Sequence, residues 1–248
     1  MNNENPFILI PIKTNSKRLP QKNLKMICGK KLFEWSLDAA IESGIGKVYI
    51  STSDENIKPK IEYNYNYNPA VGVMGSYGCL FHYIYKVIYR PQYLSEDPMQ
   101  LVDVCLHTIN KIGGSFSELI MIQPSNPLVL AKDIREAYKL FLDSGRKCVR
   151  SICKMQKSAF KSLIKSDKAH ILTSPIFNNL RSIDERDYPD TYMSNGSIVV
   201  IDMGVLKEEF TLFPENCVGF EMPPDRSIDI DTEDDFKIAE YLLKERGE

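Results

Sequence analysis

The sequence predicts an α/β fold in which a parallel sheet is covered by helices on both faces. Short apolar runs without an alternating polar face recur along the chain, as expected of strands that are buried on both sides. Segments with a helical spacing of apolar residues separate these runs. The connections are short and polar, so a single doubly wound domain over residues 1–248 is expected.

The N-terminal elements show the pattern first. Residues 7–12 (FILIPI) form an apolar run and predict a buried strand. Residues 31–43 carry apolar groups at helical spacing, and Gly44 follows as a stop signal for the helix. Residues 47–51 (KVYIS) predict the next strand. This order of strand, helix and strand predicts a parallel pair of strands.

The same pattern resumes after a break. Asp97 is a residue type that favours the N-cap of a helix, and Pro98 suits the first helical position after it. The final helix is expected to begin at the capping box that runs from Thr232 to Asp235. Other strands are expected at residues 118–123, 148–153 and 197–202, and another helix near residues 134–142.

Two stretches interrupt the pattern. Residues 63–86 form a Tyr-rich insertion that contains YNYNYN, and two interpretations remain open, a substrate lid or an insertion specific to this protein. Its glycines lack the strand-to-helix context of a phosphate-binding fingerprint. Residues 154–196 are polar with weak periodicity and predict an arm that leaves the main sheet.

Composition excludes several classes of function. The net charge of −2 argues against a general nucleic-acid-binding protein, which would be clearly basic. No apolar run reaches the roughly 18 residues of a membrane span, and the N-terminus MNNENP lacks the features of a signal peptide. The six cysteines form no CxxC pair, and His82, His107 and His170 are not spaced to join them in a zinc site. We therefore expect a cytoplasmic protein with reduced thiols and structural histidines.

A cationic loop follows the first predicted strand. Lys13, Lys17, Arg18 and Lys22 lie within ten residues, and Ser16 and Asn23 add polar side chains. Ligands of open α/β sheets bind beyond the carboxyl ends of the strands, where this loop must lie. A polyphosphate needs such a combination of charge and hydrogen-bond donors. Taken alone, the composition of the loop slightly favours the alternative, a charged surface turn.

A pair of carboxylates lies near the C-terminus, in the segment SIDIDTEDDF. In an extended chain Asp229 and Asp231 face the same side, where they can share one Mg²⁺ with phosphate oxygens and water. The alternative is a strand with one solvated face. Together with the cationic loop, the pair predicts Mg²⁺-dependent transfer of a nucleotidyl group, with Lys22 and Asp231 as the central catalytic residues.

At this point the sequence resembles a known family, the acylneuraminate cytidylyltransferases, which make CMP-activated acidic sugars. The family pattern I-P-A-R-x-G-S-K-x-x-P-x-K-N is similar to residues 10–23 here, and D-I-D is found at residues 229–231. The other matches follow in the family's order: Gly29 to Leu32, Ser51 to Glu55, Arg90 to Asp97, QPSNPL at residues 123–128, and DYP with NG at residues 187–196.

The resemblance implies a three-layer α/β/α nucleotide-diphospho-sugar transferase (Rossmann-like) fold and a homodimer with a small dimerisation arm. It implies CTP and an acidic, sialic-acid-like sugar as substrates, CMP-sugar and pyrophosphate as products, and Mg²⁺ as cofactor. By matched position, Lys13, Ser16, Lys22, Asn23 and Arg90 would bind the nucleotide, and Asp229 and Asp231 the metal. The sugar would contact Gln123, Lys161, Arg186 and Asn195.

The sequence also departs from the family pattern. Lys13 replaces an arginine, and therefore loses planar bidentate recognition of phosphate. Leu101 replaces a small polar residue near the nucleotide, and Glu185 replaces an arginine suited to a sugar carboxylate, with Arg181 and Arg186 as possible substitutes. Two alternatives therefore remain: a related enzyme for another nucleotide or sugar, and a nucleotide-sugar-binding protein that has lost catalysis.

Overall fold

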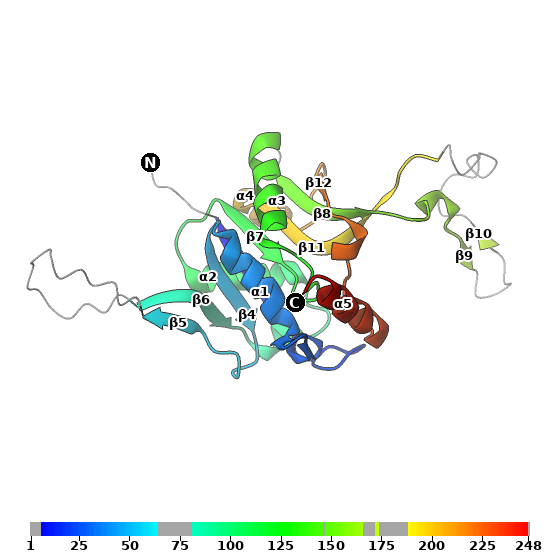
Figure 1. Cartoon of the computed structure of the whole chain (residues 1–248). Helices are drawn as coiled ribbons and strands as arrows, with labels where there is room; N and C mark the ends of the chain where they lie inside the picture. Colours follow the sequence, from blue (N-terminus) through cyan, green and yellow to red (C-terminus); the bar gives the residue numbers. More distant parts are fainter. Residues whose placement is uncertain (1–5, 64–80, 146, 166–171, 174–187, 248) are drawn as a thin grey trace, which may run out of the picture.

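The computed structural model describes residues 6–63, 81–145, 147–165, 172–173 and 188–247. Within these residues an eight-stranded sheet forms the centre of the molecule, in the order β12-β8-β11-β7-β1-β4-β6-β5 (Figure 1). Its strands are β1 (Phe7–Ile12), β4 (Lys47–Thr52), β5 (Lys60–Tyr63), β6 (Phe81–Tyr89), β7 (Glu118–Ile122), β8 (Cys148–Lys154), β11 (Tyr192–Asp202) and β12 (Val218–Glu221).

Most neighbouring strands of this sheet are parallel. β1 pairs in parallel with β4 on one side and with β7 on the other, and β6 continues the parallel order beyond β4. β11 runs antiparallel to both β7 and β8, and β5 runs antiparallel to β6 at the edge. The predicted parallel sheet is confirmed, and β11 and β5 are its antiparallel members.

The helices cover both faces of the sheet and make three layers. Ile8 and Ile10 of β1 point into a core with α1 (Leu32–Ser43) and α3 (Ala131–Ser144). Phe7 and Leu9 point to the opposite face, against α2 (Leu101–Ile112) and α4 (Met203–Glu209). A continuous apolar run was expected for a strand covered on both sides, and this arrangement confirms it.

The C-terminal helix α5 (Glu233–Glu245) closes a third apolar cluster. Its Phe236 and Leu243 pack against Trp35 of α1 and Leu19 of the loop after β1. The predicted capping box at its start is confirmed, because Thr232 accepts from the Asp235 amide and Asp235 accepts from Thr232. α5 thus brings the end of the chain against the loop that follows the first strand.

One local prediction was wrong. The helix expected to begin at Asp97 and Pro98 begins at Leu101, and Asp103 caps the backbone N–H of Gln100. Asp97 is instead bonded to a lysine of the cationic loop. Residues 227–231 belong to no strand of the described sheet, so the alternative of a strand with one solvated face does not hold.

The two interrupting stretches lie at opposite ends of the sheet in Figure 1. The stretch 63–86 includes the start of β6, a strand of the main sheet, whereas residues 64–80 lie outside the described residues. In the stretch 154–196, β11 first pairs with the end of β8, and a two-stranded sheet of β9 (Ile164–Lys165) and β10 (Leu172–Thr173) lies away from the body of the molecule. In the described part of the chain, no helix combines the length and apolar character needed to cross a bilayer.

Candidate active site

A cavity of about 280 Å³ opens beyond the carboxyl ends of β1 and β7. From β1 the chain first builds β4 and β6 on one side, and then crosses to β7 on the other side. Such a reversal of strand order leaves a crevice between the two loops, where ligands of open α/β sheets bind. Lys13 follows β1 and Gln123 follows β7, and both residues line this cavity.

The lining of the cavity combines a polar and an apolar part. Its polar residues are Lys13, Ser16, Lys22, Asn23, Arg90, Ser95, Gln100, Gln123 and Ser125. Its apolar residues are Pro11, Leu94, Met99, Leu101, Val104 and Pro124. The structure therefore brings the predicted nucleotide-binding residues and Gln123 into one cavity. The apolar part comes largely from the start of α2 and the turn before it, which suits the flat ring of a nucleobase.

The cationic loop and the carboxylate segment meet at Lys22. This residue begins a short 3-10 helix, Lys22–Leu24, after Gln21 in a left-handed conformation with φ of 53°. Its Nζ donates to the carbonyl of Ile230 at 2.5 Å and to Oδ1 of Asp231 at 3.0 Å. The Arg18 guanidinium binds the other oxygen of Asp231 at 2.8 Å. The Lys22 side chain is only 13% exposed, so its ion pair is shielded from solvent on most sides.

Asp229 lies beside this ion pair in a different electrostatic setting. The residue reaches the surface, but its carboxylate is surrounded by protein on several sides, and this desolvation raises its pKa above 3.8. The nearby Asp231 carboxylate raises the pKa further, whereas a hydrogen bond from Ser125 and the charges of Lys22 and Arg18 oppose the shift. The net effect disfavours the ionised form, and a cation placed between the two aspartates would reverse it.

The donor set at this position fits Mg²⁺. Mg²⁺ binds oxygen ligands, and it is usually held by one or two carboxylates together with substrate phosphates and water. Asp229 and Asp231 supply two such carboxylates at the edge of the cavity, and the pKa of Asp229 is raised mainly by desolvation of its carboxylate and to a smaller extent by the charge of Asp231, both of which a bound cation would offset. Among the described residues there is no cluster of three or more His, Cys, Asp or Glu side chains, so a ligand would complete the metal shell.

Two buried polar residues organise the floor of the cavity. Asn23 is 4% exposed and donates from Nδ2 to the carbonyl of Lys13 at 2.8 Å, which ties the two ends of the cationic loop together. Its Oδ1 is buried and has no hydrogen-bond partner in the described part of the chain. Such an acceptor costs about 1–3 kcal/mol when it is left unpaired. A ligand hydroxyl or a bound water can satisfy it.

Arg90 is the second of these residues, and it joins the strand ends. Its guanidinium donates to the carbonyls of Ser51 at 2.6 Å and Ile12 at 3.0 Å, and to Oγ of Ser95 at 3.0 Å. Burial lowers its pKa to about 10, so the group remains charged at neutral pH. Because its donors already bind protein oxygens, Arg90 acts mainly through its charge and through the shape of the cavity.

An exposed aspartate neutralises the outer lysines of the loop. Asp97 Oδ2 accepts from Lys17 Nζ at 2.7 Å, and its other oxygen lies 3.8 Å from Lys13 Nζ. The hydrogen bond and charge of Lys17, with a smaller effect of Lys13, lower the pKa of Asp97. Exposed ion pairs of this kind are weak, so a triphosphate can replace Asp97 as their partner.

Two other predicted sugar-binding residues, Asn195 and Lys161, do not line the cavity. Asn195 is 5% exposed, and its amide binds Ser151, Ser227 and Met222 within the core. Lys161 is exposed in the arm, with Nζ 5.8 Å from the centre of the Tyr188 ring. Arg186, together with Arg181 and Glu185, lies outside the described residues.

Sequence reasoning assigned no role to two residues that take part in the site. Ser125 lines the cavity and bonds Asp229, and its position within the QPSNPL segment next to Gln123 was the available signal. Arg18, counted only among the charges of the cationic loop, binds Asp231 directly. No histidine is found among the described residues that line the cavity.

Comparison with known proteins agrees with this geometry. A family model described as Cytidylyltransferase matches residues 7–64, which include β1, the cationic loop and β4. The chain is 25% identical over 234 residues to an N-acylneuraminate cytidylyltransferase of Streptococcus agalactiae serotype III, an alignment that covers 93% of this chain and 51% of the relative. The chain thus spans about half the length of the first curated relatives that it matches.

A second relative has a similar length. The CMP-N,N'-diacetyllegionaminic acid synthase of Legionella pneumophila is 23% identical over 242 residues, which cover 95% of each chain. Among solved structures, a CMP:2-keto-3-deoxy-manno-octonic acid synthetase complexed with CTP superposes with a TM-score of 0.66 at 16% identity, covering 98% of this chain and 99% of that chain. The chain therefore shares the fold of this synthetase, and its resemblance to the N-acylneuraminate cytidylyltransferases is confirmed.

Proposed function

We propose that this protein is a cytidylyltransferase that joins CTP to an acidic sugar and releases pyrophosphate. The observation that carries the proposal is the contact between Lys22 and Asp231, which sets a cationic loop against a carboxylate pair at the strand reversal. This arrangement suits a triphosphate whose charge is shared between lysines and a metal ion. The names of the relatives support CTP and an acidic sugar as the substrate class.

Each part of the cavity then has a role in binding CTP. Lys13, Ser16 and Lys22 hold the triphosphate by charge and hydrogen bonds. The apolar residues Leu101 and Val104 contact the base. The floor is kept in shape by Asn23 and Arg90, so the α-phosphorus is presented in a fixed orientation.

The reaction is an in-line displacement at the α-phosphorus. A bond forms between the sugar hydroxyl oxygen and the α-phosphorus, the bond from this phosphorus to the pyrophosphate oxygen breaks with its electron pair leaving on pyrophosphate, and the hydroxyl proton passes to water. Mg²⁺ held by Asp229 and Asp231 would supply neutralisation of the phosphate charge that develops. Lys22, whose ammonium is bound to Asp231 and largely shielded from water, would add a second positive charge at this position.

The sugar site is less complete than the nucleotide site in the described residues. We propose Gln123 as a contact within the cavity, and Lys161 and Arg186 as contacts supplied by the arm. The arm also suits a homodimer, because its base exposes the apolar side chains of Leu163 and Met193, at 53% and 58%. We expect a cytoplasmic enzyme, since its proposed substrates are soluble nucleotides and sugars.

The test is a pyrophosphate-release assay with Mg²⁺. Each of the four nucleoside triphosphates is combined with a panel of acidic sugars that includes N-acetylneuraminate, a diacetyllegionaminate and the eight-carbon 2-keto-3-deoxy-octonate. Release only with CTP and one of these sugars supports the proposal. Release with another triphosphate would show that this nucleotide, and not CTP, is the substrate. Tight nucleotide binding without turnover on any sugar would identify a binding protein.

The metal role has its own variant. Asp231→Asn should reduce Mg²⁺-dependent turnover at least about 100-fold, because a carboxylate ligand is lost. Glu233→Gln is the control, since Glu233 pairs with Lys25 at 2.8 Å and lies two residues from Asp231. Full activity of Asp231→Asn, in a folded protein by circular dichroism, would reject the metal assignment.

A further inference from the structure

We propose that the ion pair between Arg226 and Asp133 is a positioning device that holds residues 227–231, the carboxylate segment, against the cavity. The inference rests on the proposed function, because Asp229 and Asp231 matter there as metal ligands. Neither Arg226 nor Asp133 lines the cavity. They therefore act through the backbone that links them to the carboxylates.

The carboxylate segment needs such support because it forms no helix or strand of its own. The Ile230 amide donates to the Ser125 carbonyl at 3.0 Å, and Lys22 binds the Ile230 carbonyl. At its end, the Asp231 amide donates to Oδ2 of Asp235 in α5 at 3.1 Å. An irregular segment keeps one conformation only where its surroundings define it, and here side chains provide most of the definition.

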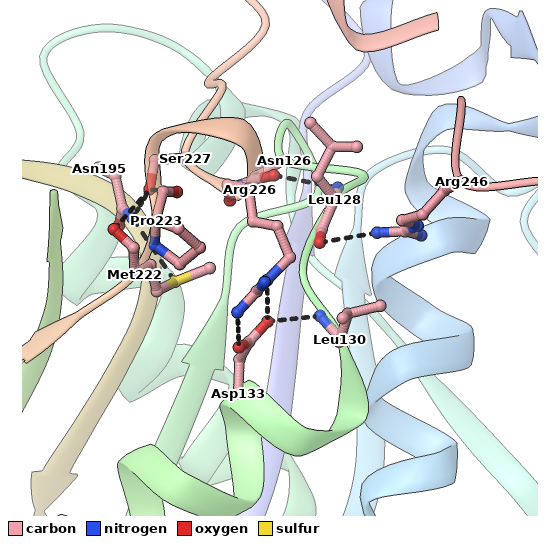
Figure 2. A network of polar contacts seen from close by, with 10 residues as sticks. All are labelled: Asn126, Leu128, Leu130, Asp133, Asn195, Met222, Pro223, Arg226, Ser227 and Arg246. Carbon is pink, nitrogen blue, oxygen red and sulfur yellow. Dashed lines mark hydrogen bonds and ion pairs between the residues drawn. The ribbon is translucent and has the colours of Figure 1, made fainter. Parts of the chain in front are cut away.

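The Arg226–Asp133 pair has the geometry of a rigid joint. Arg226 donates from Nε to Oδ2 of Asp133 at 3.2 Å and from Nη2 to Oδ1 at 2.8 Å (Figure 2). Oδ2 also accepts the Leu130 amide at 2.9 Å, at the start of α3. The Asp133 side chain is 1% exposed, and that of Arg226 is 19% exposed. Two parallel bonds to a planar fork fix orientation as well as distance.

The residues next to this pair are anchored as well. The Arg226 carbonyl accepts from Nδ2 of Asn126 at 2.9 Å, and Oδ1 of Asn126 accepts the Leu128 amide at 3.0 Å. Ser227 accepts from Nδ2 of Asn195 at 2.9 Å. Figure 2 shows these side chains converging on the turn from opposite sides. Asn126 and Asn195 are both almost fully buried, so this network is part of the core.

The position of the pair connects the two loops that make the site. Asp133 begins α3, directly after the loop that carries Gln123 and Ser125. Arg226 comes three residues before Asp229, a span of about 10 Å at most. The pair therefore sets the distance between the loop that lines the cavity and the carboxylates at its edge. Displacements of about 1 Å at a reacting centre can cost about 100-fold in rate, so such a joint matters for catalysis.

The test compares Arg226→Lys with Arg246→Lys, both in the full-length protein. Lysine keeps the charge at residue 226 but loses the fork. Arg246 is the matched control, because it is an arginine that anchors the same loop at another point: its Nη1 donates to the Leu128 carbonyl at 3.1 Å (Figure 2). Two quantities are measured: amide hydrogen exchange of peptides covering residues 227–235 without nucleotide, and the Mg²⁺ concentration that gives half-maximal pyrophosphate release.

We expect Arg226→Lys to accelerate exchange in residues 227–235 about tenfold. It should raise the half-saturating Mg²⁺ concentration about 10- to 100-fold, which is the usual effect of losing support behind a metal ligand. The KM for CTP at saturating Mg²⁺ should change less than about threefold, because Arg226 does not line the cavity. Arg246→Lys should change neither quantity.

Equal exchange and equal Mg²⁺ dependence in the two variants would overturn the inference. If the wild-type protein releases no pyrophosphate with any nucleotide, the proposed function fails, whereas the exchange experiment still decides whether Arg226 holds the segment. If Arg226→Lys does not fold, Ser227→Ala replaces it. That variant removes the acceptor of Asn195 and should accelerate exchange in the same peptides about threefold; unchanged exchange would contradict the proposal.

Discussion

Replacing Lys22 by methionine tests the centre of the proposed site. The change removes the ammonium but keeps an unbranched apolar side chain of similar length. It deletes two charge-assisted hydrogen bonds, to the Ile230 carbonyl at 2.5 Å and to Asp231 at 3.0 Å. It also removes a positive charge from the cavity that we propose for the triphosphate.

The effect on stability and the effect on catalysis differ in size. Charge-assisted hydrogen bonds contribute about 1.5–3 kcal/mol each to the free energy of unfolding. Arg18 still neutralises Asp231 at 2.8 Å, so we expect a net loss of only about 2 kcal/mol, or a fall in Tm of about 4–8 °C. Loss of a preorganised group that stabilises transition-state charge lowers kcat about 10²- to 10³-fold.

The assay is pyrophosphate release with saturating CTP, sugar and Mg²⁺, at least 15 °C below the Tm of the variant, a margin of about twice the expected shift. Lys25→Met is the matched control, because Lys25 makes an ion pair with Glu233 at 2.8 Å and lies over the Phe236 ring, but does not line the cavity. It should lose stability and keep its kcat. A folded Lys22→Met protein with more than about a tenth of the wild-type kcat would refute the role given to Lys22.

Three further predictions address other parts of the molecule. Asp97→Asn should strengthen binding of CTP about two- to fivefold at low salt, because Lys13 and Lys17 lose their internal partner; weaker binding by calorimetry would contradict this. Asp202→Ala should cost about 1 kcal/mol of unfolding free energy at pH 7, because Asp202 caps α4. Burial opposes the ionised form of Asp202, but hydrogen bonds from Val205, Lys147 and Gly204 outweigh it and lower its pKa below 3.8. This stabilisation is therefore present above pH 3.8 and is lost as the pH falls through the folded pKa, so urea titrations should show the variant and the wild type converging there. Ile230→Ala should cost about 2–5 kcal/mol of unfolding free energy in the same titration, because Ile230 is fully buried in the apolar cluster that α5 closes. A loss below about 1 kcal/mol would show that burial of Ile230 is unimportant for stability.

Local patterns in the sequence were sufficient for most of the regular elements, whereas β5, β6, β12 and α4 were not predicted. The run of residues 7–12 is apolar at every position because both faces of β1 are covered, and that pattern is visible without a structure. Gly44 ends α1 in a left-handed conformation, with φ of 66°, as a glycine stop signal predicts. The start of α2 was predicted wrongly because aspartate is a residue type that favours the N-cap of a helix. Only the fold shows that the Asp97 carboxylate binds Lys17 instead.

The sequence also determined the chemical type of the site. Lysines after the first strand and a carboxylate pair near the C-terminus are separated by more than 200 residues, yet their order along the chain matched a known family. That match placed Lys22 and Asp231 in one site before any contact was seen, and the structure brings them to 3.0 Å. Residue type and order are enough here because α5 packs against the loop after β1, which brings the carboxylates that precede the helix to the same crevice.

Only the tertiary structure decided which polar residues support the site from within. Polar residues of these types are usually found at the protein surface, and nothing in the neighbouring sequence distinguishes Asp133, Asn126 and Arg226 from solvated residues. Asn195, expected at the sugar, is instead buried and bonded to Ser227. Burial and hydrogen-bond partners depend on segments that meet across the fold, and a polar side chain becomes a structural joint only when its partner is brought into the same dry interior. The sequence thus determined the sheet, the charged loop and the carboxylates, and the packing of β7, α3 and the turn before α5 determined how the carboxylates are held.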